Sequence, residues 1–205
     1  MEEITQDKLI ELAKTSIRDC IFEASAATGK FLQGIWLFKV PDDLKDPILG
    51  SGIEIHPDKA KLRFSVAEAK KRIAQIHPDF SIIACSAVAG GSEEEARARH
   101  AKIVETNKKP AEGMAYSFYV QRPGIEPVML CQYYKAVHGT VELVGDIKIV
   151  HDFAFLPLAD LDFWSEMTPE EEQLTSKGEM LEINPKILTD SEITMRNMFP
   201  KELSI

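Results

Sequence analysis

Residues that could carry acid, base or nucleophilic chemistry are concentrated in one short block of the chain. Cys131 is the evident nucleophile, and Glu142 with Asp146 is the evident carboxylate pair. A cysteine nucleophile needs an activating base. The pattern puts His138 in a turn, about four cross-strand residue pairs away from Cys131, and His151 at the far end of a strand. The residue types permit a small hydrolase or transferase using Cys131 or the Glu142/Asp146 pair, and they name no reaction.

Two successive hairpins are expected to position these residues. The segment 114–150 alternates apolar and polar side chains in three runs, which the sequences RPGIE and AVHG separate. If Gln121 lies opposite Pro127 and Lys135 lies opposite Thr140, side-chain alternation produces one uniformly apolar face. That face comprises Tyr116, Phe118, Val120, Val128, Leu130, Tyr134, Val141, Leu143, Ile147 and Ile149.

The opposite face of the same strands is mixed in character. It comprises Ser117, Tyr119, Gln121, Met129, Cys131, Tyr133, Glu142, Val144, Asp146 and Lys148. A solvated face is one interpretation, since antiparallel sheets often expose one side to water. The tyrosines, Met129 and Cys131 make it more apolar than water requires, which favours a partner or ligand surface formed by Tyr119, Met129, Cys131, Tyr133, Glu142 and Asp146.

Before residue 114, the spacing of apolar residues is typical of a helix in some segments and of a strand in others. Residues 5–28 are typical of an amphipathic helix, residues 31–40 of a strand and residues 41–52 of a loop. Residues 59–64 are expected to form a short strand and residues 79–91 a buried one.

Each of these two strands precedes a predicted helix, over 65–76 and over 92–107. Ser65 with Glu68 and Ser92 with Glu95 both fit S-x-x-E, the pattern of a capping box at a helix start. The resulting β-α-β-α stretch would place two strands in parallel.

The tetrapeptide Ile-His-Pro-Asp occurs twice, at 55–58 and at 76–79. It permits two interpretations. Each copy could be a turn, because proline cannot continue a helix and aspartate bonds nearby amides. The similar segments that follow could instead reflect an internal duplication.

The C-terminal quarter differs in charge from the rest of the chain. Residues 152–205 hold twelve acidic and four basic residues, whereas the first 151 are almost neutral. Thr168 and Pro169 are typical of a helix start, Gly178 of a helix end, and a second short helix is expected at 190–199. We expect this acidic segment to pack on a core domain formed by residues 1–151, either as a solvated layer or by docking on a basic surface.

Composition excludes several classes. The formal net charge of -9 disfavours nucleic-acid binding, and no apolar run is long enough to cross a bilayer. The acidic N-terminus does not resemble a secretory signal, so a cytoplasmic protein is expected. Three widely spaced cysteines favour reduced thiols over disulfides or a zinc site, and neither a metal nor a cofactor is predicted.

Together these patterns predict an α+β fold. We expect a two-layer sandwich with a mixed sheet, a C-terminal three-strand antiparallel meander and helices on one face. The favoured function is a non-catalytic binding or regulatory module whose open sheet face carries a protein partner or a small ligand, with a second copy of the chain as one such partner.

Overall fold

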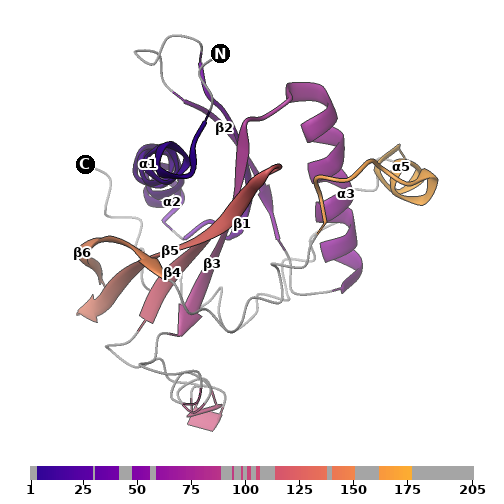
Figure 1. The fold of residues 1–205 in the computed structure, drawn as a ribbon. Helices are drawn as coiled ribbons and strands as arrows, with labels where there is room; N and C mark the ends of the chain where they lie inside the picture. The colour runs from indigo at the N-terminus through magenta and orange to yellow at the C-terminus, as the bar shows by residue number, and fades with distance from the viewer. Residues whose placement is uncertain are drawn as a thin grey trace.

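The computed structural model describes residues 4–29, 31–41, 48–55, 59–88, 94, 98, 101–102, 105–106, 114–137, 140–150 and 162–176. These residues form an α+β fold around one six-stranded sheet with the order β2-β1-β3-β4-β5-β6 (Figure 1). The strands are β1 (Gly34–Lys39), β2 (Leu49–Glu54), β3 (Phe80–Val88), β4 (Met114–Arg122), β5 (Ile125–Val137) and β6 (Thr140–Val150).

Every neighbouring pair of strands in this sheet is antiparallel. The predicted meander β4-β5-β6 is confirmed, but the prediction of a mixed sheet is wrong. The reason is that β1 lies between β2 and β3 and is antiparallel to both. The connection from β2 through α3 (Lys59–Ile76) to β3 therefore joins two strands that run the same way without touching.

The first helical stretch covers one face of the sheet. It runs without a break from Gln6 to Thr28 as α1 (Gln6–Ser16), a π-helical turn η1 (Ile17–Phe22) and α2 (Glu23–Thr28). Thr5 caps its start by accepting a hydrogen bond from the Lys8 amide at 3.4 Å, and Gly29 ends it with a left-handed φ of 69°. The predicted helix over 5–28 is thus confirmed.

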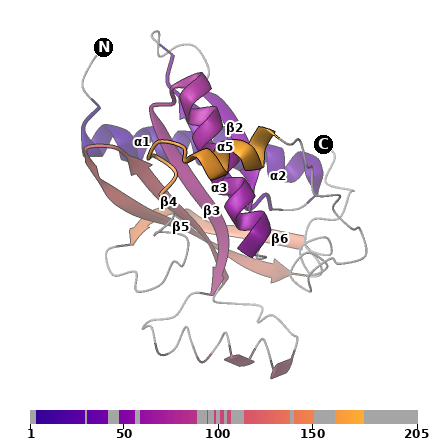
Figure 2. The same ribbon diagram turned by 90° about the vertical axis from the view of Figure 1, so that its right-hand side faces the viewer.

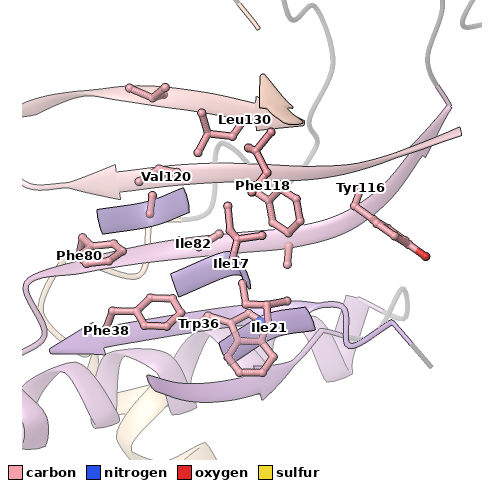
Figure 3. Packing of buried hydrophobic residues seen from close by; sticks show 14 of the residues in the cluster. Ile17, Ile21, Trp36, Phe38, Phe80, Ile82, Tyr116, Phe118, Val120 and Leu130 are labelled. Atoms are coloured by element: carbon pink, nitrogen blue, oxygen red, sulfur yellow. The ribbon is translucent and has the colours of Figure 1, made fainter. Parts of the chain in front are cut away.

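Beneath this helix lies the larger hydrophobic core. Ile17 and Ile21 meet aromatic and branched side chains from β1, β3, β4 and β5 (Figure 3). The rings of Phe31, Tyr116 and Tyr134 form a continuous stack, with centroid separations of 4.0 and 4.4 Å. Aromatic stacking adds to the area that these side chains bury, so this core anchors the helix to the sheet.

The other face is covered as well, by α3, and α5 (Pro169–Ser176) packs on the side of α3 that faces away from the sheet (Figure 2). A second core lies here and contains Ile35, Leu37, Ile53, Ala69, Ile83, Tyr119, Met129 and Phe163. The prediction of a two-layer sandwich with helices on one face is therefore wrong, because α3 turns its apolar side toward the face that was expected to be open.

Two of the local predictions before α3 are also wrong. Residues 59–64 belong to α3 and not to a strand. Ser65 lies inside that helix, where its buried hydroxyl donates to the Glu54 carbonyl at 2.8 Å, so it does not cap a helix start. Lysine, alanine, leucine and arginine are good helix formers, and the helix simply extends upstream through them.

The predicted loop 41–52 is wrong in part, since residues 49–54 form β2. Its glycines suit a strand here because aromatic rings of β1 lie directly over them. A Cβ atom at Gly50 would lie 2.9 Å from the ring of Phe38, and one at Gly52 would lie 3.2 Å from the ring of Trp36. Cross-strand packing therefore requires glycine where composition alone predicts a turn.

The acidic segment is described over residues 162–176. Phe163 is fully buried in the second core, and Thr168 and Glu171 form a reciprocal capping box at the start of α5. Glu171 also pairs with the buried Lys70 of α3 at 2.9 Å. The helix start at Thr168 and Pro169 is confirmed, while the end at Gly178, the helix at 190–199 and the box at Ser92 lie outside the described residues. The division of the chain at residue 151 stays a prediction.

Candidate partner-binding surface

The register of the meander sets which side chains share a face. Val120 lies opposite Val128, as the predicted pairing of β4 with β5 requires. In the β5–β6 pair, Thr140 lies opposite Val137 and not opposite Lys135, a shift of two residues. An even shift preserves the faces, so the predicted apolar face is the one that α1 covers.

The expected site residues on β4 and on the β4 side of β5 are not accessible. Tyr119 lies opposite Met129, and both side chains are buried in the second core. Cys131 lies opposite Ser117 and is only 5% exposed. Tyr119 and Met129 therefore pack in the second core with Phe163, and Cys131 is buried on the same face of the sheet.

Cys131, Tyr133 and Lys148 come together on the same face. Cys131 lies opposite Lys148 on β6, and the Lys148 ammonium sits 5.9 Å from the centre of the Tyr133 ring. Burial raises the pKa of the Cys131 thiol above its usual value, although the Tyr133 hydroxyl and the Lys148 charge act in the opposite direction. A raised pKa keeps Cys131 as a thiol at neutral pH, which is the unreactive form.

Asp146 is separated from this group by an irregularity in β6. Between Tyr133 opposite Val144 and Cys131 opposite Lys148, β5 has one residue and β6 has three. Gly145 takes a φ of +68° in this bulge, and the exposed Asp146 carboxylate lies 3.8 Å from Arg18 of η1. Glu142 lies opposite Lys135 instead, so the two carboxylates have different neighbours.

Gln132 holds the bulge from inside. Its side chain is 4% exposed and its amide donates to the carbonyls of Val144 and Gly145 at 3.1 and 3.0 Å. The carbonyls that the bulge removes from the strand ladder are thereby satisfied. Sequence reasoning missed this residue, although a lone glutamine between Leu130 and Tyr134 on an apolar face was a signal for it.

What stays accessible is the outer end of the β5–β6 hairpin. We define the β5–β6 corner as Tyr133 and Val144, with Lys135, Glu142 and Lys148 around them on the second face, and Leu143 and Ile149 on the first face. Leu143, Val144 and Ile149 are 50%, 37% and 39% exposed, which places three large apolar side chains within seven residues of one strand. Within the described residues β6 is also the end of the sheet, so one side of its main chain lacks a neighbouring strand.

A second polar cluster lies where α3 ends, at the later copy of Ile-His-Pro-Asp. His77 has a left-handed φ of 46°, and the Asp79 carboxylate accepts a hydrogen bond from the Val40 amide at 2.8 Å. Arg122 donates to the Asp79 carbonyl at 2.7 Å, and Asp79 and Arg122 line an open hollow with Pro78, Pro123 and Trp164. This copy therefore ends a helix and fixes β1 to β4, as the turn interpretation requires, while the histidine, proline and aspartate of the earlier copy lie outside the described residues.

Other kinds of site lack support in the part of the chain that is described. No group of three or more metal-binding side chains gathers among these residues. No helix in the described ranges is long and apolar enough to span a bilayer. His138 and His151, the bases considered for Cys131, lie outside them. Cys20, Cys85 and Cys131 are free thiols.

Comparison with known proteins adds no assignment. Neither a family model, nor a curated protein, nor a solved structure matches the chain. The function must therefore be inferred from the chemistry of the surface.

Proposed function

We propose that the protein is a non-catalytic binding or regulatory module whose protein partner docks on the β5–β6 corner. The observation that carries the proposal is the exposure of Leu143, Val144 and Ile149 on an end strand of the sheet. Apolar side chains in this number are costly to leave in water and are typical of an interface.

The composition of the corner supports the same proposal. Tyr133 and Val144 supply an aromatic and aliphatic centre, and Lys135, Glu142 and Lys148 supply charges of both signs around it. Protein interfaces share this anatomy, with an apolar centre and a polar rim. A small molecule needs a more enclosed site, and the end of an extended strand offers little enclosure.

The electrostatics of Cys131 do not favour the rival hydrolase or transferase. Its thiol is buried and its pKa is raised, whereas a catalytic thiol has a lowered pKa and access to substrate. Glu142 and Asp146 have different neighbours, which does not suit a convergent carboxylate pair. In the proposed function Cys131 has a packing role, as a buried side chain opposite Lys148.

Site-specific photo-cross-linking tests the proposal. A photoreactive amino acid replaces Tyr133 in one variant and Arg63, an exposed residue of α3, in a control variant. We expect one protein to cross-link from the corner and not from the control position when the variants are added to a cell extract.

The captured protein is then purified and titrated with unlabelled variants. Val144→Lys should weaken its binding about tenfold or more, because it places a charge at the apolar centre, while Arg63→Ala should leave binding unchanged. Equal cross-linking from both positions, or an affinity that Val144→Lys does not change, would contradict the proposal.

A further inference from the structure

The sequence of β6 is self-complementary about Gly145. Reading outward from that glycine, Ile147 matches Leu143, Lys148 matches Glu142 and Ile149 matches Val141. The apolar members of these pairs belong to the face that α1 covers, and the charged pair belongs to the other face, where Glu142 lies opposite Lys135 and Lys148 opposite Cys131. A strand with this order can meet a copy of itself with apolar residues opposite one another on one face. On the other face, two Glu142/Lys148 pairs flank the axis, where Val144 lies opposite Asp146.

We infer that two copies of the chain associate by antiparallel pairing of β6 with β6 about a two-fold axis at Gly145. This pairing puts Glu142 opposite Lys148 of the second copy twice, by symmetry. It also puts Leu143 opposite Ile147, which continues the apolar face of the sheet from one copy into the other. The inference rests on the proposed function and names a second copy as the partner at the β5–β6 corner.

The bulge is compatible with this arrangement. It lies on the proposed axis. Residues 141–143 of each copy would pair with residues 147–149 of the other, which gives one short ladder on each side of the axis. Gly145 has no side chain to separate the two strands, and a Cβ atom placed there would find nothing within 4 Å. Asp146 lies beside Arg18, which offsets its charge near the axis.

The opposite end of the sheet is arranged differently. α3 contacts β2 through Arg72, which donates to the Gly52 carbonyl at 3.1 Å and to the Ser51 hydroxyl at 2.9 Å. β2 is also shorter, with six residues against eleven in β6. Association through β6 rather than β2 follows from this asymmetry.

Charge reversal in trans tests the inference. Glu142→Lys alone would set lysine against Lys148 of its copy, and Lys148→Glu alone would set glutamate against Glu142. Each variant alone should therefore form a dimer about tenfold weaker than the wild type, measured by sedimentation equilibrium. When the two variants are mixed, both cross-strand pairs become attractive again, and the mixed dimer should return to within about threefold of wild-type affinity.

Restoration in trans cannot arise from a change within one chain, such as new repulsion between Lys135 and the lysine introduced by Glu142→Lys. Glu126→Lys, a reversal at an exposed position of β5 that β6 does not reach, should leave dimerisation unchanged. Thermal unfolding of each variant verifies that it is folded.

A wild-type chain that remains monomeric at every concentration, or a mixture no tighter than the single variants, would overturn the inference. The proposed function would survive that result if a different protein cross-links at Tyr133, and it would fail separately if none does.

Discussion

At the scale of single residues, Gln132 shapes the candidate surface more than any predicted site residue. A buried amide that faces two bulge carbonyls fixes the path of β6 past Gly145. At this bulge the Asp146 carboxylate lies 3.8 Å from Arg18. The Gln132 amide therefore stabilises the bulge in the end strand of the described sheet.

Replacing Gln132 with leucine should destabilise the fold by about 1–3 kcal/mol, because the carbonyls of Val144 and Gly145 lose a buried donor. Gln121→Leu is the matched control. The Gln121 side-chain oxygen is buried without a hydrogen-bond partner among the described residues, so its removal should cost little or nothing. Urea unfolding of both variants measures the difference, and equal costs would show that Gln132 does not hold the bulge.

The thiols give a second prediction at this scale. Burial raises the pKa of Cys85 to about 12 and also raises the pKa values of Cys20 and Cys131. At neutral pH the native chain should therefore react with iodoacetamide about tenfold or more slowly than the unfolded chain, which should take up three labels. Fast, selective alkylation of native Cys131 would instead favour the hydrolase or transferase.

Residue-level patterns predicted which side chains share a face of the meander, but they did not predict which of these side chains are exposed to solvent. Alternation correctly assigned Tyr119, Met129 and Cys131 to the face opposite Tyr116 and Phe118. It could not show that Phe163, more than thirty residues later in the chain, would pack over that face. The alternation of apolar and polar residues in a strand does not show whether a segment distant in sequence will cover one of its faces.

At the scale of elements, α5 is tied to α3 by one ion pair at its first turn. The Lys70 ammonium is 7% exposed and lies 2.9 Å from the Glu171 carboxylate, whose side chain is 23% exposed. Partial burial raises the pKa of Glu171, but the Thr168 amide and Lys70 outweigh that effect and hold the pKa below its usual value of 4.5.

Glu171→Gln should cost about 1–2 kcal/mol at pH 7, because it leaves the Lys70 charge buried without its partner. A lowered carboxyl pKa contributes stability that is present above pH 4.5 and is lost as the pH falls through the folded-state value. The cost of Glu171→Gln should therefore shrink well below pH 4.5. The change is measured by urea unfolding at both pH values.

Lys70→Met provides the matched variant, since it removes the buried charge itself. The double variant Lys70→Met with Glu171→Gln should be more stable than the sum of the single effects implies. A cost of Glu171→Gln that is the same above and below the carboxyl titration would contradict the ion pair as the tie between α3 and α5.

Elements with strong local signals could be predicted, and elements that depend on neighbours could not. The helix over 5–28 has a cap, a period and a terminal glycine in its own sequence. β2 pairs with β1 along its whole length, and the rings of Phe38 and Trp36 lie over its glycines. α3 begins at Lys59, upstream of the predicted start at Ser65. Tertiary packing overrides a weak local preference in both cases.

At the scale of the whole molecule, the sheet is covered unequally. α1, η1 and α2 shield one face, and α3 shields the β1 and β2 side of the other, with α5 packed on α3 (Figure 1). The β5–β6 corner lies at the far end of the strand order from β2, with its apolar side chains exposed. This strand end, with apolar side chains exposed on both faces, is the surface that we propose for association. Most of the formal net charge of -9 comes from residues 152–205 and not from this corner.

Hydrogen exchange of the main-chain amides tests the central claim most directly, because it reports on the whole chain at once. The experiment compares the free chain with the saturated complex, whether the partner is a second copy or another protein. We predict slower exchange along residues 141–149 of β6 and at Tyr133, with β2 unchanged. Protection that appears at β2 or beside Trp164, and not at β6, would contradict the β5–β6 corner as the binding surface.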